Sequence, residues 1–167
     1  MKKLICAAMA LALALLAACA GALAEGAAAG SFTFATTDLD GNIVTSAELY
    51  AGNRITVINF WATWCPPCVG ELGALAQLHR QLREMDCGVV GILLDDDFDA
   101  ARRLMKENST DYPVLLLSED MYDLVRGITT IPTTCFADEA GRIVGEPIVG
   151  AYPDRYLSAV EALVKTF

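Results

Sequence analysis

Residues 55–68 read ITVINFWATWCPPC, and this stretch decides the fold. Its first half, Ile55–Trp61, is apolar and rich in β-branched side chains, which predicts a buried strand. Residues 69–85 have the apolar spacing of an amphipathic helix. Cys65 and Cys68 therefore stand where a strand passes into a helix, whose N-terminal N–H groups favour a thiolate. Two thiols at such a junction can close into a disulfide and reopen, which is typical of a thiol–disulfide exchange site.

The N-terminus has the pattern of an export signal. Lys2 and Lys3 precede an uncharged apolar run, Leu4–Ala18, which is short for a membrane-spanning helix. Leu-Ala-Ala before Cys19 resembles a bacterial lipoprotein signal, in which Cys19 would be lipidated and become the mature N-terminus. Ala-Leu-Ala ending at residue 24 also fits a signal-peptide cleavage site. An uncleaved anchor is the third alternative.

The chain is expected to divide into three parts. Residues 1–24 form the signal peptide (residues 1–18 if the lipoprotein site is used), and the Ala/Gly-rich residues 25–30 form a flexible tether. Residues 31–167 suit one domain with one core. Because the lysines stay inside, all three alternatives export this domain. A lipidated Cys19 would hold it at a membrane surface, whereas cleavage after residue 24 would leave it periplasmic or secreted.

Charge and cysteine content narrow the function further. The formal net charge is −9, and loss of the two leader lysines makes the mature domain more acidic. This argues against nucleic acid or an anionic membrane surface as a direct partner. An exported protein tolerates disulfides, so a structural pair has to be considered among the four cysteines of the domain. These are Cys65, Cys68, Cys87 and Cys135.

The remaining patterns predict an α/β fold. Strands are expected over 32–44 (a hairpin turning at Asp40-Gly41), 55–61, 89–94, 114–117, 133–137 and 142–144; helices are expected over 46–50, 69–85, 98–107, 119–126 and from Asp154 onward. Ser46, Asp97 and Asp154 are the expected helix caps, and Gly88 is expected to end the second helix. This order predicts a mixed sheet with helices on both faces, two parallel long strands and an antiparallel final pair.

The chain resembles the thioredoxin superfamily and, more narrowly, the TlpA/ResA-like thiol-disulfide oxidoreductases of bacterial cell envelopes. The matching motifs are NFWATWCPPC at 59–68, Glu71, YPV at 112–114, IPTT at 131–134 and a hairpin over 138–144. The resemblance implies a thioredoxin-like fold, with a central mixed β-sheet flanked by helices and an N-terminal β-hairpin extension. Two positions depart from the family pattern: Gly73 replaces a usual proline, and Cys135 replaces a usual apolar residue.

The two cysteines of the CPPC motif have distinct expected roles. Cys65 is expected to attack a partner disulfide and form a mixed disulfide, which Cys68, one turn into the helix and less exposed, then resolves. The alternative is a permanent structural disulfide. It is disfavoured because a bond across three positions restrains the unfolded chain little. Pro66 and Pro67 remove two N–H donors from the loop, which should move the redox potential.

Further site residues follow from the resemblance. It implies a cis peptide bond before Pro132 and a role for the Ile131 backbone in binding a partner chain. Trp64 is a candidate surface aromatic for client contact, together with Pro66, so the expected client-binding residues are Trp64, Pro66, Ile131 and Pro132.

Two residues bear on proton transfer. Glu71 lies one turn after Cys68 on the same helix face and is either a proton relay for Cys68 or a solvated surface residue. Asn59 stands where cytosolic thioredoxins carry a buried acid, so it is interpreted as structural. Trp61 is expected in the core.

Other polar residues point away from metal binding. His79 is the only histidine and lacks partners at metal-ligand spacing. Asp95-Asp96-Asp97 lacks the spacing and glycine of a calcium loop, and it is interpreted as a helix cap and solvated face. Cys87 precedes one predicted strand and Cys135 lies in another. In the resembled sheet these two strands flank a common central strand, so we expect thiols rather than a second disulfide. No cofactor or metal is expected.

The leading hypothesis is a membrane-tethered, extracytoplasmic thiol-disulfide oxidoreductase that reduces protein disulfides. The resemblance implies electrons from a membrane thiol relay, and clients such as apocytochrome c or a methionine sulfoxide reductase. One alternative is a peroxidase of the same fold, but its P-x-x-x-T/S-x-x-C motif fails at Ile58 and Ala62. The other is a non-catalytic lipoprotein that binds a metal or ligand.

Overall fold

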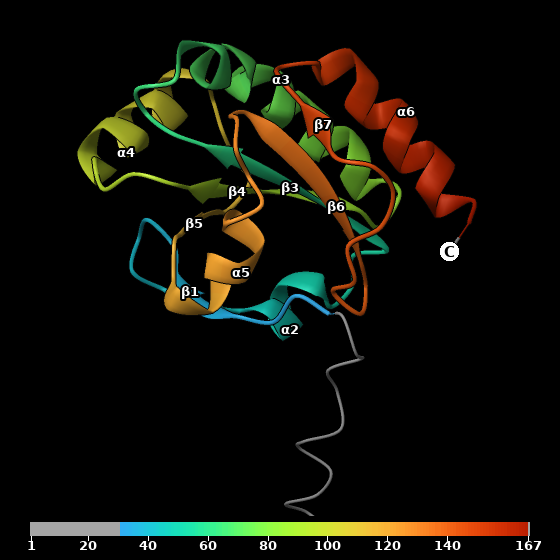
Figure 1. Cartoon of the computed structure of the whole chain (residues 1–167). Coiled ribbons are helices and arrows are strands. Elements are labelled where there is room, and N and C mark those ends of the chain that lie inside the picture. The colour runs from blue at the N-terminus through green and yellow to red at the C-terminus, as the bar shows by residue number, and fades with distance from the viewer. Residues whose placement is uncertain (1–30, 167) are drawn as a thin grey trace, which may run out of the picture.

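A five-stranded mixed sheet forms the centre of the computed structural model, which describes residues 31–166 (Figure 1). The elements in chain order are β1 (Ala35–Thr37), β2 (Ile43–Thr45), α2 (Ser46–Tyr50), β3 (Ile55–Trp61), α3 (Pro66–Arg83), β4 (Gly88–Leu93), α4 (Phe98–Glu107), β5 (Val114–Leu116), the 3-10 turn η1 (Glu119–Met121), α5 (Tyr122–Val125), β6 (Thr133–Asp138), β7 (Ile148–Val149) and α6 (Pro153–Val164). The strand order in the sheet is β5-β4-β3-β6-β7. The expected thioredoxin-like architecture is confirmed, including the N-terminal hairpin of β1 and β2.

Strand β3 occupies the middle of the sheet. It pairs in parallel with β4, which follows the α3 crossover, and antiparallel with β6. Figure 1 shows α3, α4 and α6 over one face of the sheet, and α2, α5 and the hairpin over the other. Because α3 begins just beyond the carboxyl end of the central strand, the CPPC motif lies at the edge where β3, α3 and the start of β6 meet.

The core has two halves, one on each face of the sheet. All seven residues of β3 are buried, and their side chains alternate between the faces. Val57 and Trp61 pack with the α3 leucines and with α6, whereas Ile58 and Phe60 pack toward α5 and the hairpin. Each fully buried side chain of this size contributes about 1.5–3 kcal/mol to folding. The run of apolar residues without polar alternation is therefore explained by a central strand covered on both faces.

Several predicted boundaries of helices are wrong. Thr45, not Ser46, caps α2, and the Ser46 hydroxyl instead accepts a hydrogen bond from the Phe34 N–H. Helix α3 begins three residues earlier than predicted, since Pro66 and Pro67 fit a first turn that needs no N–H donors. It ends at Arg83, so Gly88 is the first residue of β4 rather than a helix terminator. Gly73 does not interrupt α3.

The C-terminal part departs most from prediction. Residues 142–144 form no named strand, although they pair with the end of β6 through an isolated bridge between Ala137 and Ile143 and through the Val144 N–H, which donates to the Phe136 carbonyl at 2.9 Å. Gly145, with a φ of 69°, turns the chain in a conformation that favours glycine, and pairing with β6 resumes in β7. Helix α6 is capped at Tyr152 without a side-chain hydrogen bond, and Asp154 lies inside its first turn.

Asp138 fixes the tight turn after β6, and its replacement tests this role. Its carboxylate accepts hydrogen bonds from the N–H groups of Ala140 and Arg142 (3.0 and 2.9 Å) and from Arg142 Nε (2.7 Å). Burial raises the pKa of Asp138, but these bonds outweigh it, and the net pKa is lowered. The stabilisation is therefore present above the unfolded pKa of about 3.9 and lost as the pH falls through the folded value.

We expect Asp138→Asn to lower the free energy of unfolding by about 1–3 kcal/mol at neutral pH, because buried N–H groups lose a charged acceptor. The difference from wild type should shrink in acid, where the wild-type carboxyl is itself protonated. Urea denaturation at several pH values measures this. Asp123→Asn is the matched control, since Asp123 forms an exposed i,i+3 ion pair with Arg126 and should change stability little. Equal effects of the two substitutions would contradict the proposed role of Asp138.

Candidate active site

The two cysteines of the CPPC motif are joined in a disulfide, with their Cα atoms 5.3 Å apart. Cys65 is the N-cap of α3, and Cys68 lies in the first helical turn, as the sequence predicts. The Cys65 side chain makes no capping hydrogen bond. The two prolines that follow supply no N–H groups, so the helix dipole and the later N–H groups are the remaining means of stabilising a Cys65 thiolate.

The two sulfurs differ in accessibility less than the sequence suggests. Cys65 is 4% exposed and Cys68 is 0% exposed, so the predicted order holds. However, Cys65 is itself buried in the disulfide form, and its Sγ atom lies 3.8 Å from the carbonyl oxygen of Ile131.

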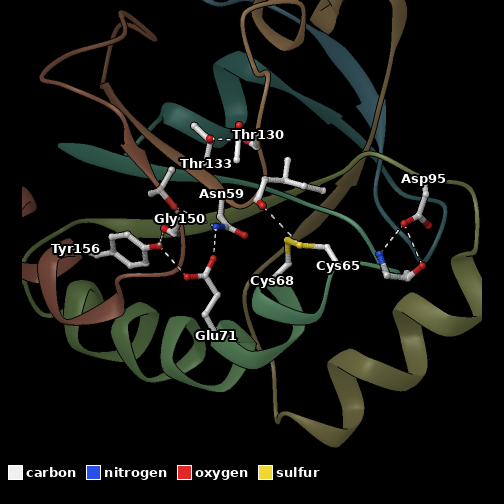
Figure 2. The surroundings of a disulfide bond; sticks show 12 residues. Asn59, Cys65, Cys68, Glu71, Asp95, Thr130, Thr133, Gly150 and Tyr156 are labelled. Atoms are coloured by element: carbon white, nitrogen blue, oxygen red, sulfur yellow. Dashed lines mark hydrogen bonds between the residues drawn. A yellow bond between two sulfur atoms is a disulfide. The ribbon is translucent and has the colours of Figure 1, made fainter.

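The loop before β6 contains the Ile131–Pro132 cis peptide bond, as predicted. Two hydrogen bonds hold this loop. The Thr133 hydroxyl donates to the carbonyl of Thr130 at 2.7 Å (Figure 2). The Gly150 N–H donates to the carbonyl of Pro132 at 2.8 Å. Ile131 is half-buried and Pro132 is buried. The fold thus brings the loop of Ile131 and Pro132 to the Cys65 sulfur, although Cys65 and Ile131 are 66 positions apart in the chain.

Exposed side chains flank the buried disulfide. Trp64 is 71% exposed, and Pro66 is also exposed. The loop that carries Trp64 is held by Asp95, whose Oδ2 atom accepts hydrogen bonds from the Thr63 N–H (2.6 Å) and hydroxyl (3.0 Å). Sequence reasoning treated Asp95 as part of a solvated face and missed this contact, since only the tertiary fold brings it to residue 63. The neighbouring Asp97 caps α4, as predicted.

Glu71 is buried, so the alternative of a solvated surface residue is wrong. It is 2% exposed, and its two carboxylate oxygens accept separate hydrogen bonds. The Asn59 amide Nδ2 donates to Oε1 at 2.9 Å, and the Tyr156 hydroxyl donates to Oε2 at 2.8 Å. Burial raises the pKa of Glu71, and the bonds from Tyr156 and Asn59 offset part of that rise. A carboxyl of this kind can hold or release a proton closer to neutral pH than an exposed glutamate.

Asn59 joins Glu71 to the rest of the site. Its Nδ2 atom also donates to the Thr134 hydroxyl (3.1 Å), whereas its Oδ1 atom is buried and has no hydrogen-bond partner among the described residues. In Figure 2, this oxygen points toward the Cys65–Cys68 disulfide. The interpretation of Asn59 as a structural residue is therefore incomplete, because a buried amide oxygen without a donor is a free acceptor.

Tyr156 is the residue that sequence reasoning missed. The apolar pattern of this last helix predicts that three aliphatic side chains face inward, namely Leu157, Val160 and Val164. Val160 is buried, but the other two are only partly buried, while Tyr156 is 0% exposed. Its spacing of four positions from Val160, which places the two side chains on one helix face, was the available signal.

Cys87 and Cys135 are buried free thiols, as expected. Cys135 lies in β6, where it pairs with Ile58 of β3, whereas Cys87 directly precedes β4. The central strand β3 therefore separates the two thiols. Burial raises the pKa of both thiols, which keeps them protonated. Neither therefore has the thiolate character of a redox-active cysteine.

Within residues 31–166, no group of three His, Cys, Asp or Glu side chains is placed to hold a metal ion. His79 instead has a structural contact, since its Nδ1 atom accepts a hydrogen bond from the Val89 N–H at 3.0 Å. None of the helices in this part of the chain combines the length and apolarity needed to cross a bilayer. The predicted signal segment, Cys19 and the tether lie outside the described residues.

Comparison with known proteins agrees with this geometry. Residues 26–145 match the model of the AhpC/TSA family. A thiol:disulfide interchange protein DsbE homolog from Paracoccus denitrificans is 31% identical over 130 residues, which cover 74% of this chain and 69% of the relative. The thiol-disulfide oxidoreductase ResA of Bacillus thuringiensis subsp. konkukian is 25% identical over 113 residues, covering 68% of this chain. The match spans 64% of that relative's own length.

The fold has a close counterpart among solved structures. A thiol:disulfide interchange protein of the thioredoxin family from Chlorobium tepidum TLS superposes with a TM-score of 0.71 and 27% sequence identity, covering 81% of this chain and 95% of that one. The predicted resemblance is thereby confirmed on both sequence and structure. The chain belongs to the AhpC/TSA family within the thioredoxin superfamily, and its relatives include ResA-like and DsbE-like proteins.

Proposed function

We propose that this protein is an extracytoplasmic thiol-disulfide oxidoreductase that reduces disulfides in other proteins. The observation that carries the proposal is the Cys65–Cys68 disulfide at the start of α3, beside the Ile131–Pro132 loop and flanked by exposed Trp64. The relatives are a thiol-disulfide oxidoreductase ResA and a thiol:disulfide interchange protein DsbE homolog, which supports the same chemistry.

The reaction begins from the reduced dithiol. The Cys65 thiolate attacks a client disulfide, forms a mixed disulfide with one client sulfur, and releases the other as a thiolate that takes up a proton. Cys68 then loses its proton and attacks the Cys65 sulfur. This step forms the Cys65–Cys68 bond, breaks the mixed disulfide and releases the second client thiol. Two electrons and two protons pass from this protein to the client, so a dithiol donor must reduce the Cys65–Cys68 bond after each cycle.

Glu71 is the proposed proton acceptor for Cys68. Both residues lie on the first turns of α3, three positions apart, which places them on one helix face. Burial raises the pKa of the carboxyl, so it competes better for a thiol proton than an exposed carboxylate does. The unpaired Asn59 oxygen is a suitable acceptor for the Cys68 thiol before that proton leaves.

Client contacts are assigned to the surface around Cys65. Trp64 and Pro66 are exposed beside the disulfide, and the Ile131 backbone lies at the sulfur. An extended client segment placed there can bond to the loop backbone and pack on the indole ring. The clients proposed from the family resemblance are apocytochrome c or a methionine sulfoxide reductase, and the proposed electron donor is a membrane thiol relay.

The location is proposed from the N-terminal sequence alone. Lipidation of Cys19 would tether the domain to the membrane through residues 25–30. Mass spectrometry of the mature N-terminus distinguishes a lipidated Cys19 from cleavage after residue 24.

The residues at positions 58 and 62 argue against the peroxidase alternative. Ile58 and Ala62 are buried in the core, and neither side chain offers a hydroxyl to a peroxide.

Insulin reduction and redox titration test the proposed activity. We expect catalytic turnover of insulin with dithiothreitol as the donor, and a Cys65/Cys68 potential near that of thioredoxin, about −270 mV, rather than near about −120 mV, the value of a strong oxidant. Equilibration with dithiothreitol or glutathione and thiol alkylation measures the potential. A value near the strong oxidants would overturn the reductant assignment, and absence of turnover would overturn the enzyme assignment.

A further inference from the structure

We propose that Tyr156 is a positioning residue that couples the protonation state of Glu71 to the Ile131–Pro132 loop through the backbone of Gly150. The inference rests on the proposed function for its catalytic meaning, because it joins the proposed proton acceptor to the proposed client-binding loop. Its structural content can be tested without turnover.

The Tyr156 hydroxyl lies at the centre of a buried polar cluster (Figure 2). It is 2.8 Å from Glu71 Oε2 and 3.3 Å from the carbonyl oxygen of Gly150. The N–H of Tyr152 lies 3.3 Å from the same hydroxyl and donates to it. The side chain comes from α6, whereas Glu71 comes from α3 and Gly150 follows β7, so one hydroxyl connects three separate segments.

A hydroxyl has one proton, so it cannot donate to both acceptors at once. When Glu71 is ionised, the charge-assisted bond to Oε2 is the stronger one and takes the proton. When Glu71 is protonated, Oε1 still faces the Asn59 amide donor, so the carboxyl proton belongs on Oε2. Glu71 then donates to Tyr156, and the Tyr156 proton turns to the Gly150 carbonyl.

Gly150 carries this change to the loop. Its N–H donates to the Pro132 carbonyl at 2.8 Å, so the same residue bonds to the loop on one side and faces Tyr156 on the other. The carbonyl and the N–H belong to two peptide units joined at the Gly150 Cα, so a bond gained or lost at the carbonyl changes the restraint on the orientation of the residue that donates to Pro132. Protonation of Glu71 therefore changes the bonding of the segment that lies beside the Cys65 sulfur.

Tyr156 moves a hydrogen bond and does not itself ionise. Burial raises its pKa to about 12; among the smaller effects, a hydrogen bond with Thr134 lowers the pKa and the bond to Glu71 raises it. The other titratable groups that face Glu71 are Tyr112, which precedes β5, and Cys68 on its own helix. Burial raises the pKa of Tyr112 as well, and the Glu71 charge adds to that rise. Of the groups with a shifted pKa that face this cluster in the described residues, Glu71 is therefore the one that burial moves toward neutral pH.

The test compares Tyr156→Phe with wild type in the oxidised protein. Carbon-13 NMR of the Glu71 carboxyl reads its pKa directly, and the Gly150 carbonyl and Ile131 amide signals report the loop. In wild type, we expect these loop signals to titrate with the pKa of Glu71. Tyr156→Phe removes a bond to the charged form, so the Glu71 pKa should rise further, by about one to two pH units, and the loop signals should no longer follow it.

Two further variants sharpen the comparison. Tyr152→Phe removes an exposed phenol hydroxyl from the same segment and should leave both titrations unchanged. Glu71→Gln removes the titrating group, so the loop signals should be flat with pH, and adding Tyr156→Phe should have no further pH effect. Loop signals that still titrate with Glu71 in Tyr156→Phe would overturn the proposal.

The outcome is separable from that of the proposed function. If wild type does not reduce insulin, but its loop signals follow the Glu71 pKa only when Tyr156 is present, the coupling is supported and the enzyme assignment is contradicted. If insulin is reduced, we expect the acidic limb of the pH–rate profile to shift upward in Tyr156→Phe, and an unchanged profile counts against the coupling. Should Tyr156→Phe not fold, the wild-type titration remains decisive, since Gly150 signals that do not follow Glu71 refute the proposal.

Discussion

Cys65→Ser is expected to reduce insulin turnover to the uncatalysed background, whereas Cys68→Ser should still attack a client once and then stop. The difference follows from their positions at the start of α3. Cys65 is the N-cap, next to the loop that would hold the client, and Cys68 is fully buried beneath it. A serine hydroxyl does not ionise near neutral pH and cannot replace either thiolate.

The trapped species distinguishes exchange from a permanent structural disulfide. Without Cys68, the mixed disulfide between Cys65 and the client has no resolving thiol, so a covalent complex should accumulate and run as a heavier band on a non-reducing gel. With Cys65 removed, the buried Cys68 should form little of this complex. The same gel with an envelope extract would identify clients by mass spectrometry of the trapped band.

Cys135→Ala is the matched control. It removes a third thiol that is buried on the opposite face of the sheet and whose pKa burial raises. Turnover should remain near wild type, apart from the modest loss of stability expected for a small reduction in core volume. A trapped complex through position 68 but not through position 65 would reverse the assigned roles, and full turnover in Cys65→Ser would contradict the mechanism.

The sequence predicted the parts of the site that depend on local pattern. Strand β3 and helix α4 have the predicted boundaries, because an uninterrupted β-branched run and an Asp cap are local signals. The motif also placed Cys65 and Cys68 correctly at the start of a helix. The cis peptide bond before Pro132 was reached only through the family resemblance, since an isolated X-Pro bond is mostly trans.

What the sequence could not predict depends on contacts between distant segments. The i,i+3 spacing placed Glu71 on the same helix face as Cys68, but it did not indicate whether that face is exposed or buried. The packing of α6, which brings Tyr156 to the carboxylate, is a tertiary contact that the spacing does not show. Asp95 reaches Thr63 across the carboxyl ends of two strands. Strand β7 is too short to show any alternation, so its pairing with β6 had no local signature.

Asn59→Asp is expected to lower the free energy of unfolding, and the loss should grow as the pH rises. Asn59 Nδ2 donates to Glu71 Oε1 at 2.9 Å, and an aspartate offers a second carboxylate at that distance in place of the donor. Two buried carboxylates at hydrogen-bond distance cannot both ionise readily, so the pair should retain a proton well above the pH at which either residue titrates in the unfolded chain.

The sign of the pH dependence follows from proton binding. The folded variant holds a proton that the unfolded chain releases above about pH 4, so the free energy of unfolding falls as pH rises, by about 1.4 kcal/mol per unit until the pair loses its proton. Wild-type Glu71 has the same sign of dependence, since burial raises its pKa, but the variant should be steeper. Near neutral pH, we expect a loss of about 3–5 kcal/mol.

Urea denaturation of the oxidised protein across the pH range measures this slope, and a swapped pair provides the strongest check. Glu71→Gln in the Asn59→Asp background presents an amide donor to the carboxylate introduced at position 59. Its carbonyl oxygen accepts the hydrogen bond of the Tyr156 hydroxyl. The double variant therefore has one buried charge, as in wild type, and both hydrogen bonds. Stability should recover in this double variant. Gln77→Glu is the control, because it makes the same amide-to-carboxylate change at an exposed position of α3. Parallel pH curves for Asn59→Asp and wild type, or no recovery in the swap, would show that the Asn59–Glu71 bond does not control the carboxyl.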